Sequence, residues 1–150
     1  MSFTFATFRA ASLAASATVL MALPALAADI SVSEAYARSS GMKAKAGAVF
    51  MQISNSGDAD DRLIAATSDI ARKVELHTHK IDENGVARMI HVEGGFVIPA
   101  GGSHSLARGG DHVMFMGLTE AMEPGKIINV TLTFEKAGDI ELEIPVDLDR

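Results

Sequence analysis

Apolar and polar side chains alternate along much of the chain after residue 45. In segment 128–135, Ile, Val, Leu and Phe alternate with Asn, Thr and Glu, and in segment 140–144 Ile and Leu alternate with Glu. A period of two with one polar face is typical of half-buried antiparallel strands. Between these two segments, 136–139 (KAGD) contains the glycine expected of a hairpin connection.

Turn-forming clusters of Gly, Pro, Asn and Asp punctuate the chain about every ten residues, a spacing that favours a sandwich or barrel over βαβ units. Further strands are predicted at 48–54, 62–67, 73–79, 87–92 and 111–118. Segment 33–41 is ambiguous, and a helical turn is compatible with 70–72. With 150 residues and no internal repeat, the sequence predicts a single all-β domain.

The first 27 residues have the pattern of a secretory signal peptide. A short segment with one arginine, Arg9, precedes an apolar stretch at 10–23, and Pro24 to Ala27 ends in small residues. We predict cleavage after Ala27, export to the periplasm, and a mature domain of residues 28–150. An uncleaved membrane anchor is the alternative, but the stretch is only weakly hydrophobic. No cysteine follows it, which argues against a lipoprotein.

Composition excludes several kinds of function. Cleavage would remove one arginine and no acid, so the mature chain is one unit more negative than the −6 of the full sequence. It has no Lys/Arg cluster to neutralise phosphates, so no nucleic-acid partner is expected. It also has no other segment suited to membrane insertion. The absence of cysteine excludes disulfides, thiolate metal sites, cysteine nucleophiles and blue-copper sites of the His₂Cys type.

Histidine and methionine are concentrated in a few predicted strands. If 111–116 is a strand, His112, Met114 and Met116 share one face while Val113 and Phe115 point to the core. Thioether sulfur is a soft ligand that selects Cu(I), and imidazole suits copper in either oxidation state. From spacing alone, a copper site and an incidental set of core and surface residues are about equally favoured.

The other strands carry similar pairs. His77 aligns with His79, and Met89 with His91. Of the remaining candidates, Met51 is assigned to the core, Met42 and Met122 to neither core nor metal site, and His104 to an exposed loop.

Several segments together resemble the periplasmic copper chaperones called PCuAC, and the likeness extends over roughly residues 30–147. They are VELH (74–77), GVARM (85–89), VEGG (92–95), IPAGG (98–102) and HVMFMGL (112–118), with KAGAVFMQI (45–53) and NSGD (55–58) upstream. The resemblance implies a cupredoxin-like Greek-key β-sandwich. It implies one Cu(I) held by His77, Met89, His112 and Met114, and delivery of that copper toward the dinuclear copper centre of a cytochrome c oxidase.

The chain departs from the family pattern at three points. The second spacer, 90–111, is one residue longer; Thr78 and His79 follow His77 where a methionine is common; and the C-terminal segment lacks His and Met. His79 and His91 are therefore the candidates for any supplementary Cu(II) ligand, although each is more simply a surface residue.

We therefore expect a monomeric copper carrier without catalytic activity, whose partner is an acceptor protein such as the oxidase copper-centre subunit or its assembly factor. Copper storage or scavenging, a copper-dependent redox enzyme and a purely structural sandwich are the alternatives. Of the two methionines in strand 111–118, Met114 lies one strand repeat from His112, ~6.5–7 Å, and Met116 lies two. Met114 is therefore the predicted ligand.

Overall fold

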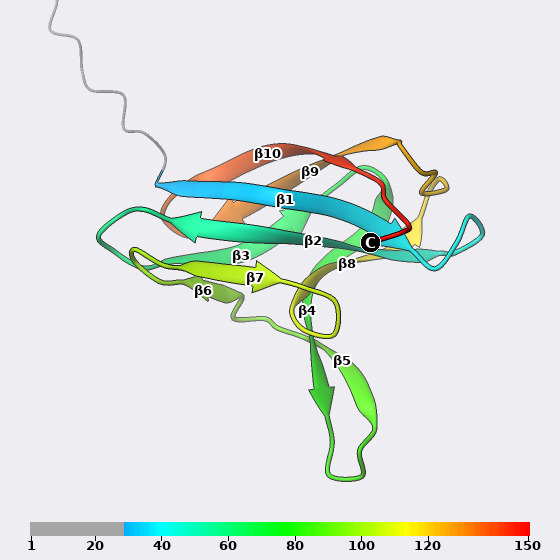
Figure 1. Cartoon of the computed structure of the whole chain (residues 1–150), viewed down its shortest axis with the longest axis horizontal. Helices are drawn as coiled ribbons and strands as arrows, with labels where there is room; N and C mark the ends of the chain where they lie inside the picture. The colour runs from blue at the N-terminus through cyan, green and yellow to red at the C-terminus, as the bar shows by residue number, and fades with distance from the viewer. Residues whose placement is uncertain (1–28) are drawn as a thin grey trace, which may run out of the picture.

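The computed structural model describes residues 29–150, and the predicted signal peptide lies outside this range. The described chain forms two antiparallel sheets packed as a sandwich (Figure 1), which confirms the all-β prediction. The ten strands are β1 (Ile30–Ser39), β2 (Ala46–Asn55), β3 (Asp61–Thr67), β4 (Ala71–Ile81), β5 (Ala87–His91), β6 (Phe96–Ile98), β7 (Ser103–Leu106), β8 (His112–Leu118), β9 (Ile127–Phe134) and β10 (Gly138–Pro145).

The larger sheet has the order β1-β2-β8-β4-β5, with β7 also paired to β2. The smaller sheet has the order β10-β9-β3-β6. Strand β8 therefore lies between β2 and β4, although more than 50 residues separate β2 from β8 in sequence. This non-local pairing brings together the histidine and methionine segments that the sequence only suggests are related.

The core lies between the two sheets and follows the predicted alternation. In β9, Ile128, Val130, Leu132 and Phe134 are buried, while the residues between them are exposed or half-buried. In β8, Val113 and Phe115 are completely buried. Because successive side chains of a strand point to opposite faces, burial of these two residues turns the neighbouring His112 and Met114 to the outer face of the larger sheet.

Two predictions about individual side chains are wrong. Met122 is completely buried, and it packs so closely over Gly47 that a Cβ there would lie 2.7 Å from the Met122 sulfur. It is a core residue, held there although its local sequence resembles a loop. His104 is not in a loop but on the short strand β7, where its ring stacks on Phe96 and pairs with Asp111. Residues 70–72 form a turn and the start of β4, not a helical turn.

Strands β4 and β5 form a hairpin that projects from the body of the sandwich (Figure 1). Strand β8 pairs with β4 only as far as His77, so the outer part of β4 is paired with β5 alone. Every residue of β5 is exposed. The base of this hairpin is thus the place where the rigid sheet ends and an accessible extension begins. In the part of the chain that the structure describes, no helix has the length and hydropathy required to cross a membrane.

Candidate metal centre

The four predicted ligands lie on three adjacent strands of the larger sheet. In the strand register, His77 of β4 lies opposite His112 of β8 on one side and opposite His91 of β5 on the other. Met89 lies opposite His79, which is two residues beyond His77. Directly opposed residues, and residues two apart on one strand, share a face of the sheet. The structure therefore places all the predicted ligands on one face.

The imidazole rings on this face are close to one another. The ring centroid of His112 lies 6.0 Å from that of His77 and 5.8 Å from that of His79. His91 stacks on the outer side of His77, with centroids 5.9 Å apart. With metal–nitrogen bonds of about 2 Å, two rings at these separations can reach the same ion.

Three ring nitrogens in this cluster are buried and have no hydrogen-bond partner among the described residues. They are Nδ1 of His77, Nδ1 of His79 and Nε2 of His112. An unsatisfied buried polar atom costs about 1–3 kcal/mol, so its presence in a folded protein calls for an explanation. A metal ion that binds these lone pairs would supply the missing partner.

The environment of His112 suits it to metal binding. Its side chain is only 2% exposed, and its Nδ1–H donates to the carbonyl oxygen of Gly110 at 3.0 Å. That hydrogen bond leaves the Nε2 lone pair free, because a neutral imidazole has one donor and one acceptor nitrogen. Burial lowers the pKa of His112, and the nearby rings of His77 and His79 add to this effect. The ring is therefore kept neutral, the form that binds metals.

We expect His112 of the metal-free protein to titrate below pH 6.5, the ordinary value for imidazole. The unfolded chain would then bind more protons than the folded chain as the pH falls through about 6.5, so the free energy of unfolding would decrease below that pH. NMR titration of the His112 ring measures its midpoint. Urea unfolding at pH 7.5 and 5.5 measures the change in the free energy of unfolding, and this change should be smaller in His112→Gln. A midpoint above 6.5 would contradict this account of the site.

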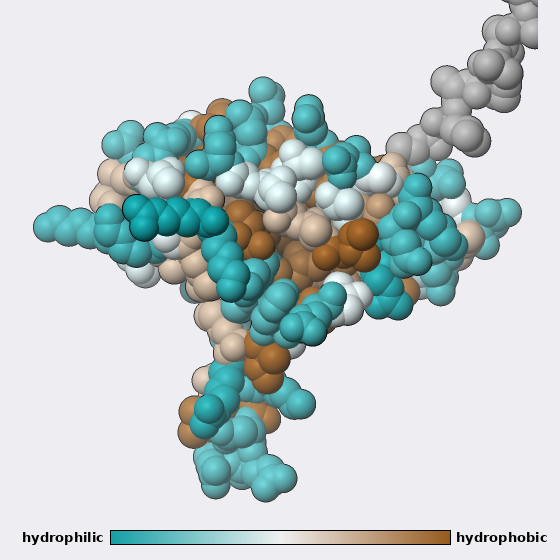
Figure 2. Space-filling model, turned by 180° about the vertical axis from the view of Figure 1, so that it is seen from behind, coloured by the Kyte–Doolittle hydropathy of each residue, from teal (hydrophilic) through white to brown (hydrophobic). Residues whose placement is uncertain are grey.

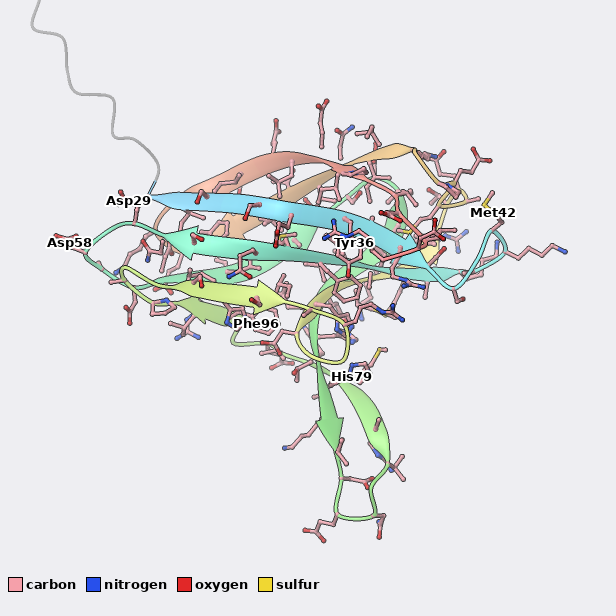
Figure 3. All side chains as sticks on the ribbon, viewed as in Figure 1. Asp29, Tyr36, Met42, Asp58, His79 and Phe96 are labelled. Atoms are coloured by element: carbon pink, nitrogen blue, oxygen red, sulfur yellow. The ribbon has the colours of Figure 1, made fainter. Side chains whose placement is uncertain are left out.

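An open pocket lies at the base of the hairpin. Its lining includes His79, Met89, His112 and Met114, with Phe50 and the small residues 46–48 forming one wall. Figure 3 shows His79 where the hairpin leaves the sandwich. Met89 is 51% exposed, so one methionine of the pocket is open to solvent. Figure 2 shows apolar surface on the projecting hairpin as well, where Ile81, Val86 and Ile90 are exposed.

The structure distinguishes residues that the sequence left equivalent. His79, which sequence reasoning favoured as a surface residue, is half-buried and lines the pocket. His77 lies beside the pocket without lining it, and Met116 is also absent from the lining. The spacing His-x-His was the signal for His79, because it places both rings on one face. The set His77, Met89, His112 and Met114 stays a prediction, with His79 as a competitor for His77.

The donor types present limit which metal this face can hold. Within residues 29–150, no group of three or more His, Cys, Asp or Glu side chains is arranged to bind a metal ion. The pocket does contain two methionine side chains, Met89 and Met114, beside His79 and His112. Two imidazoles and two thioethers form a neutral, soft set, which suits Cu(I) and gives little affinity for Mg²⁺ or Ca²⁺.

Comparison with known proteins places the chain in a family. Residues 30–146 match the family model described as "LpqE-like: Putative lipoprotein LpqE-like". The chain belongs to the LpqE-like family. A relative from Leifsonia xyli subsp. xyli, "Putative lipoprotein Lxx21020", is 35% identical over 117 residues, which make up 78% of this chain and 69% of the relative.

Solved structures connect this LpqE-like chain with PCuAC domains. The copper-bound PCuAC domain from PmoF2 superposes with a TM-score of 0.66 at 24% identity, over 80% of this chain and 93% of that domain. Apo-DR1885 from Deinococcus radiodurans gives 0.62 at 26% identity, over 99% and 97% of the two chains. The Cu(I) form of DR1885 gives 0.61 at 29% identity, over 75% and 74%. The resemblance to PCuAC is thereby confirmed.

Proposed function

We propose that this protein is an exported copper carrier that binds one Cu(I) through His77, Met89, His112 and Met114. The observation that carries the proposal is the set of buried, unpartnered imidazole nitrogens of His77, His79 and His112 on one face of the sheet, where Met89 and Met114 line the same pocket as His112. The PCuAC-like fold supports it, since DR1885, at 29% identity, is described with Cu(I) bound. The family description as lipoproteins supports export, and we propose the periplasm as the compartment.

The open geometry of the pocket suits transfer better than storage. Met89 is half-exposed on the projecting hairpin, whereas His112 is buried at the sheet. An acceptor can therefore displace the Met89 sulfur first while the deeper ligands still hold the ion. We propose that the acceptor is a copper-centre subunit of cytochrome c oxidase or its assembly factor, and that the protein has no catalytic activity of its own.

The mature protein is expected to bind one equivalent of Cu(I) under reducing conditions, in competition with a chromogenic Cu(I) chelator. Its soft, neutral donor set should give no comparable affinity for Zn²⁺. His104→Ala is a suitable control, because His104 is paired with Asp111 and does not line the pocket. Failure to compete with the chelator, or equal binding of Zn²⁺, would rule out the proposed copper carrier.

Transfer is a separate measurement. The Cu(I)-loaded protein is mixed with the metal-free copper-centre domain of a cytochrome c oxidase, and the copper content of both proteins is followed after separation. A carrier is expected to load the acceptor faster than a Cu(I)–chelator complex that maintains the same free copper concentration. Retention of copper by this protein under those conditions would favour storage or scavenging.

A further inference from the structure

A carboxylate stands among the neutral donors of the candidate site. Glu75 lies two residues before His77 on β4, and therefore on the same face, and in the register it is opposite Met114 of β8. The side chains of Glu75 and His77 are similarly enclosed, 13% and 12% exposed. Carboxylate oxygen is a hard ligand that is not expected to bind Cu(I). An acidic residue in this position would therefore affect a soft copper site through one of the ligands.

Both carboxylate oxygens of Glu75 are engaged. Oε2 lies 2.9 Å from Nε2 of His77, and Oε1 lies 2.6 Å from Nζ of Lys73. Nδ1 of His91 is farther away, 3.9 Å from Oε1. The hydrogen bond to His77 is the main cause of a pKa of about 2 for Glu75, with a further contribution from Lys73. A glutamate with these two donors beside it is ionised at neutral pH.

The contact with Glu75 determines which nitrogen of His77 is free. An ionised carboxylate only accepts hydrogen bonds, so Nε2 of His77 carries the proton and donates it. Nδ1 then holds the lone pair, and Nδ1 is the atom that is buried without a partner. His79 has no such contact among the hydrogen bonds and ion pairs of the described residues, so its ring is not fixed in this way.

We propose that Glu75 is a positioning residue of the copper site, which holds His77 in the Nε2–H tautomer with Nδ1 presented as the ligand atom. By fixing this ring, Glu75 selects His77 over His79 as the second imidazole. Only the effect on copper binding rests on the proposed function; the tautomer of His77 does not depend on it. Carboxylates in this outer position orient and polarise metal-binding histidines, and their loss typically costs about 10–100-fold in metal affinity.

Glu75 is unsuited to bind the copper itself. Carboxylate oxygen is a hard ligand that favours Mg²⁺, Ca²⁺ and Mn²⁺ over Cu(I). Its two oxygens are also occupied by His77 and Lys73. The role through His77 is therefore the one that agrees with both the chemistry and the contacts.

The first test needs no copper. Long-range ¹H–¹⁵N NMR of the metal-free protein at about pH 8, where imidazole is neutral, reports the tautomer of each histidine. We expect His77 to be entirely in the Nε2–H form, with a slowly exchanging Nε2–H proton. Glu75→Gln should preserve that proton, because the amide oxygen can accept the same bond, and Glu75→Leu should lose it. A wild-type His77 with its proton on Nδ1, or in rapid exchange between tautomers, would overturn the proposal.

The second test measures Cu(I) affinity by chelator competition. Glu75→Leu is expected to weaken binding by about 10–100-fold, whereas Glu75→Gln stays within a few-fold of wild type. Lys73→Met, which removes the other partner of Glu75, serves as the matched control and should also stay within a few-fold. His77→Ala should lose far more affinity than His79→Ala. The positioning role would be refuted by full affinity in Glu75→Leu, or by equal losses of affinity in Glu75→Gln and Glu75→Leu. It would also be refuted by a larger loss of affinity in His79→Ala than in His77→Ala.

The two tests also separate this inference from the proposed function. If the wild-type protein binds no Cu(I), the carrier proposal fails, while the NMR result still decides whether Glu75 fixes the His77 ring. Far-UV circular dichroism verifies that each variant retains its β-structure. The wild-type NMR spectrum alone can overturn the inference, so it does not depend on any variant being folded.

Discussion

Replacing Met114 by Leu is expected to weaken Cu(I) binding by at least about tenfold while leaving the fold intact. Met114 lines the pocket one strand repeat from His112, and its sulfur is a soft ligand that Leu cannot replace. Such volume-conserving exchanges usually cost less than ~1.5 kcal/mol of stability, so the loss of affinity can be assigned to the sulfur. Chelator competition measures the affinity, and thermal unfolding of the metal-free protein measures the stability.

Met116→Leu is the matched control for this experiment. Met116 is half-buried like Met114 and lies on the same face of β8, but it does not line the pocket. Its cross-strand neighbours are Lys73 and Ala46, neither of which is a candidate ligand. We expect its affinity for Cu(I) to equal that of the wild type. Loss of binding in Met116→Leu with normal binding in Met114→Leu would show that the ligand strand has been assigned in the wrong register.

The second large effect concerns Asp61, a buried carboxylate at the start of β3. It accepts hydrogen bonds from the backbone N–H groups of Arg62, Lys136 and Ala137, at 2.7, 2.9 and 2.9 Å. The bonds from Lys136 and Ala137 tie β3 to the connection between β9 and β10. Asp61→Ala would leave three backbone donors without this partner, and hydrogen bonds to charged groups contribute about 1.5–3 kcal/mol each. We expect a loss of about 3 kcal/mol in the free energy of unfolding at pH 7, measured in urea.

The effect of Asp61 should depend on pH in a defined direction. Burial acts to raise the pKa of Asp61, but the backbone bonds and Lys136 together outweigh it, so the pKa lies below its ordinary value. The stabilisation is therefore fully present above about pH 4, the unfolded value, and is lost as the pH falls through the folded pKa. The difference in the free energy of unfolding between wild type and Asp61→Ala should therefore become smaller as the pH falls below about 4. Asp60→Ala removes one exposed hydrogen bond, from the N–H of Ala100. It should change the free energy of unfolding little, both at pH 7 and at acid pH.

The sequence alone determined the fold class and, in the strands that alternate regularly, such as β8 and β9, which side chains are buried. Alternation is a local property, because successive side chains of a strand must point to opposite faces. It placed Val113 and Phe115 in the core and His112 and Met114 outside it, and the structure agrees. Alternation failed where the local rule is interrupted. In β1 the register shifts between Ser33 and Tyr36, and Glu34 has a φ of 53°, so the alternation changes phase within the strand.

Only the tertiary structure decided how the metal-binding residues lie relative to one another. His77 faces His112 across a pairing of β4 with β8, two strands that are separated by 30 residues of the chain. Nothing local sets that register, which depends on how both sheets bury their apolar faces. The same packing buried Met122 and placed His79 in the pocket. The sequence supplied the types of donor, and the long-range pairing of strands determined which of them can meet at one ion.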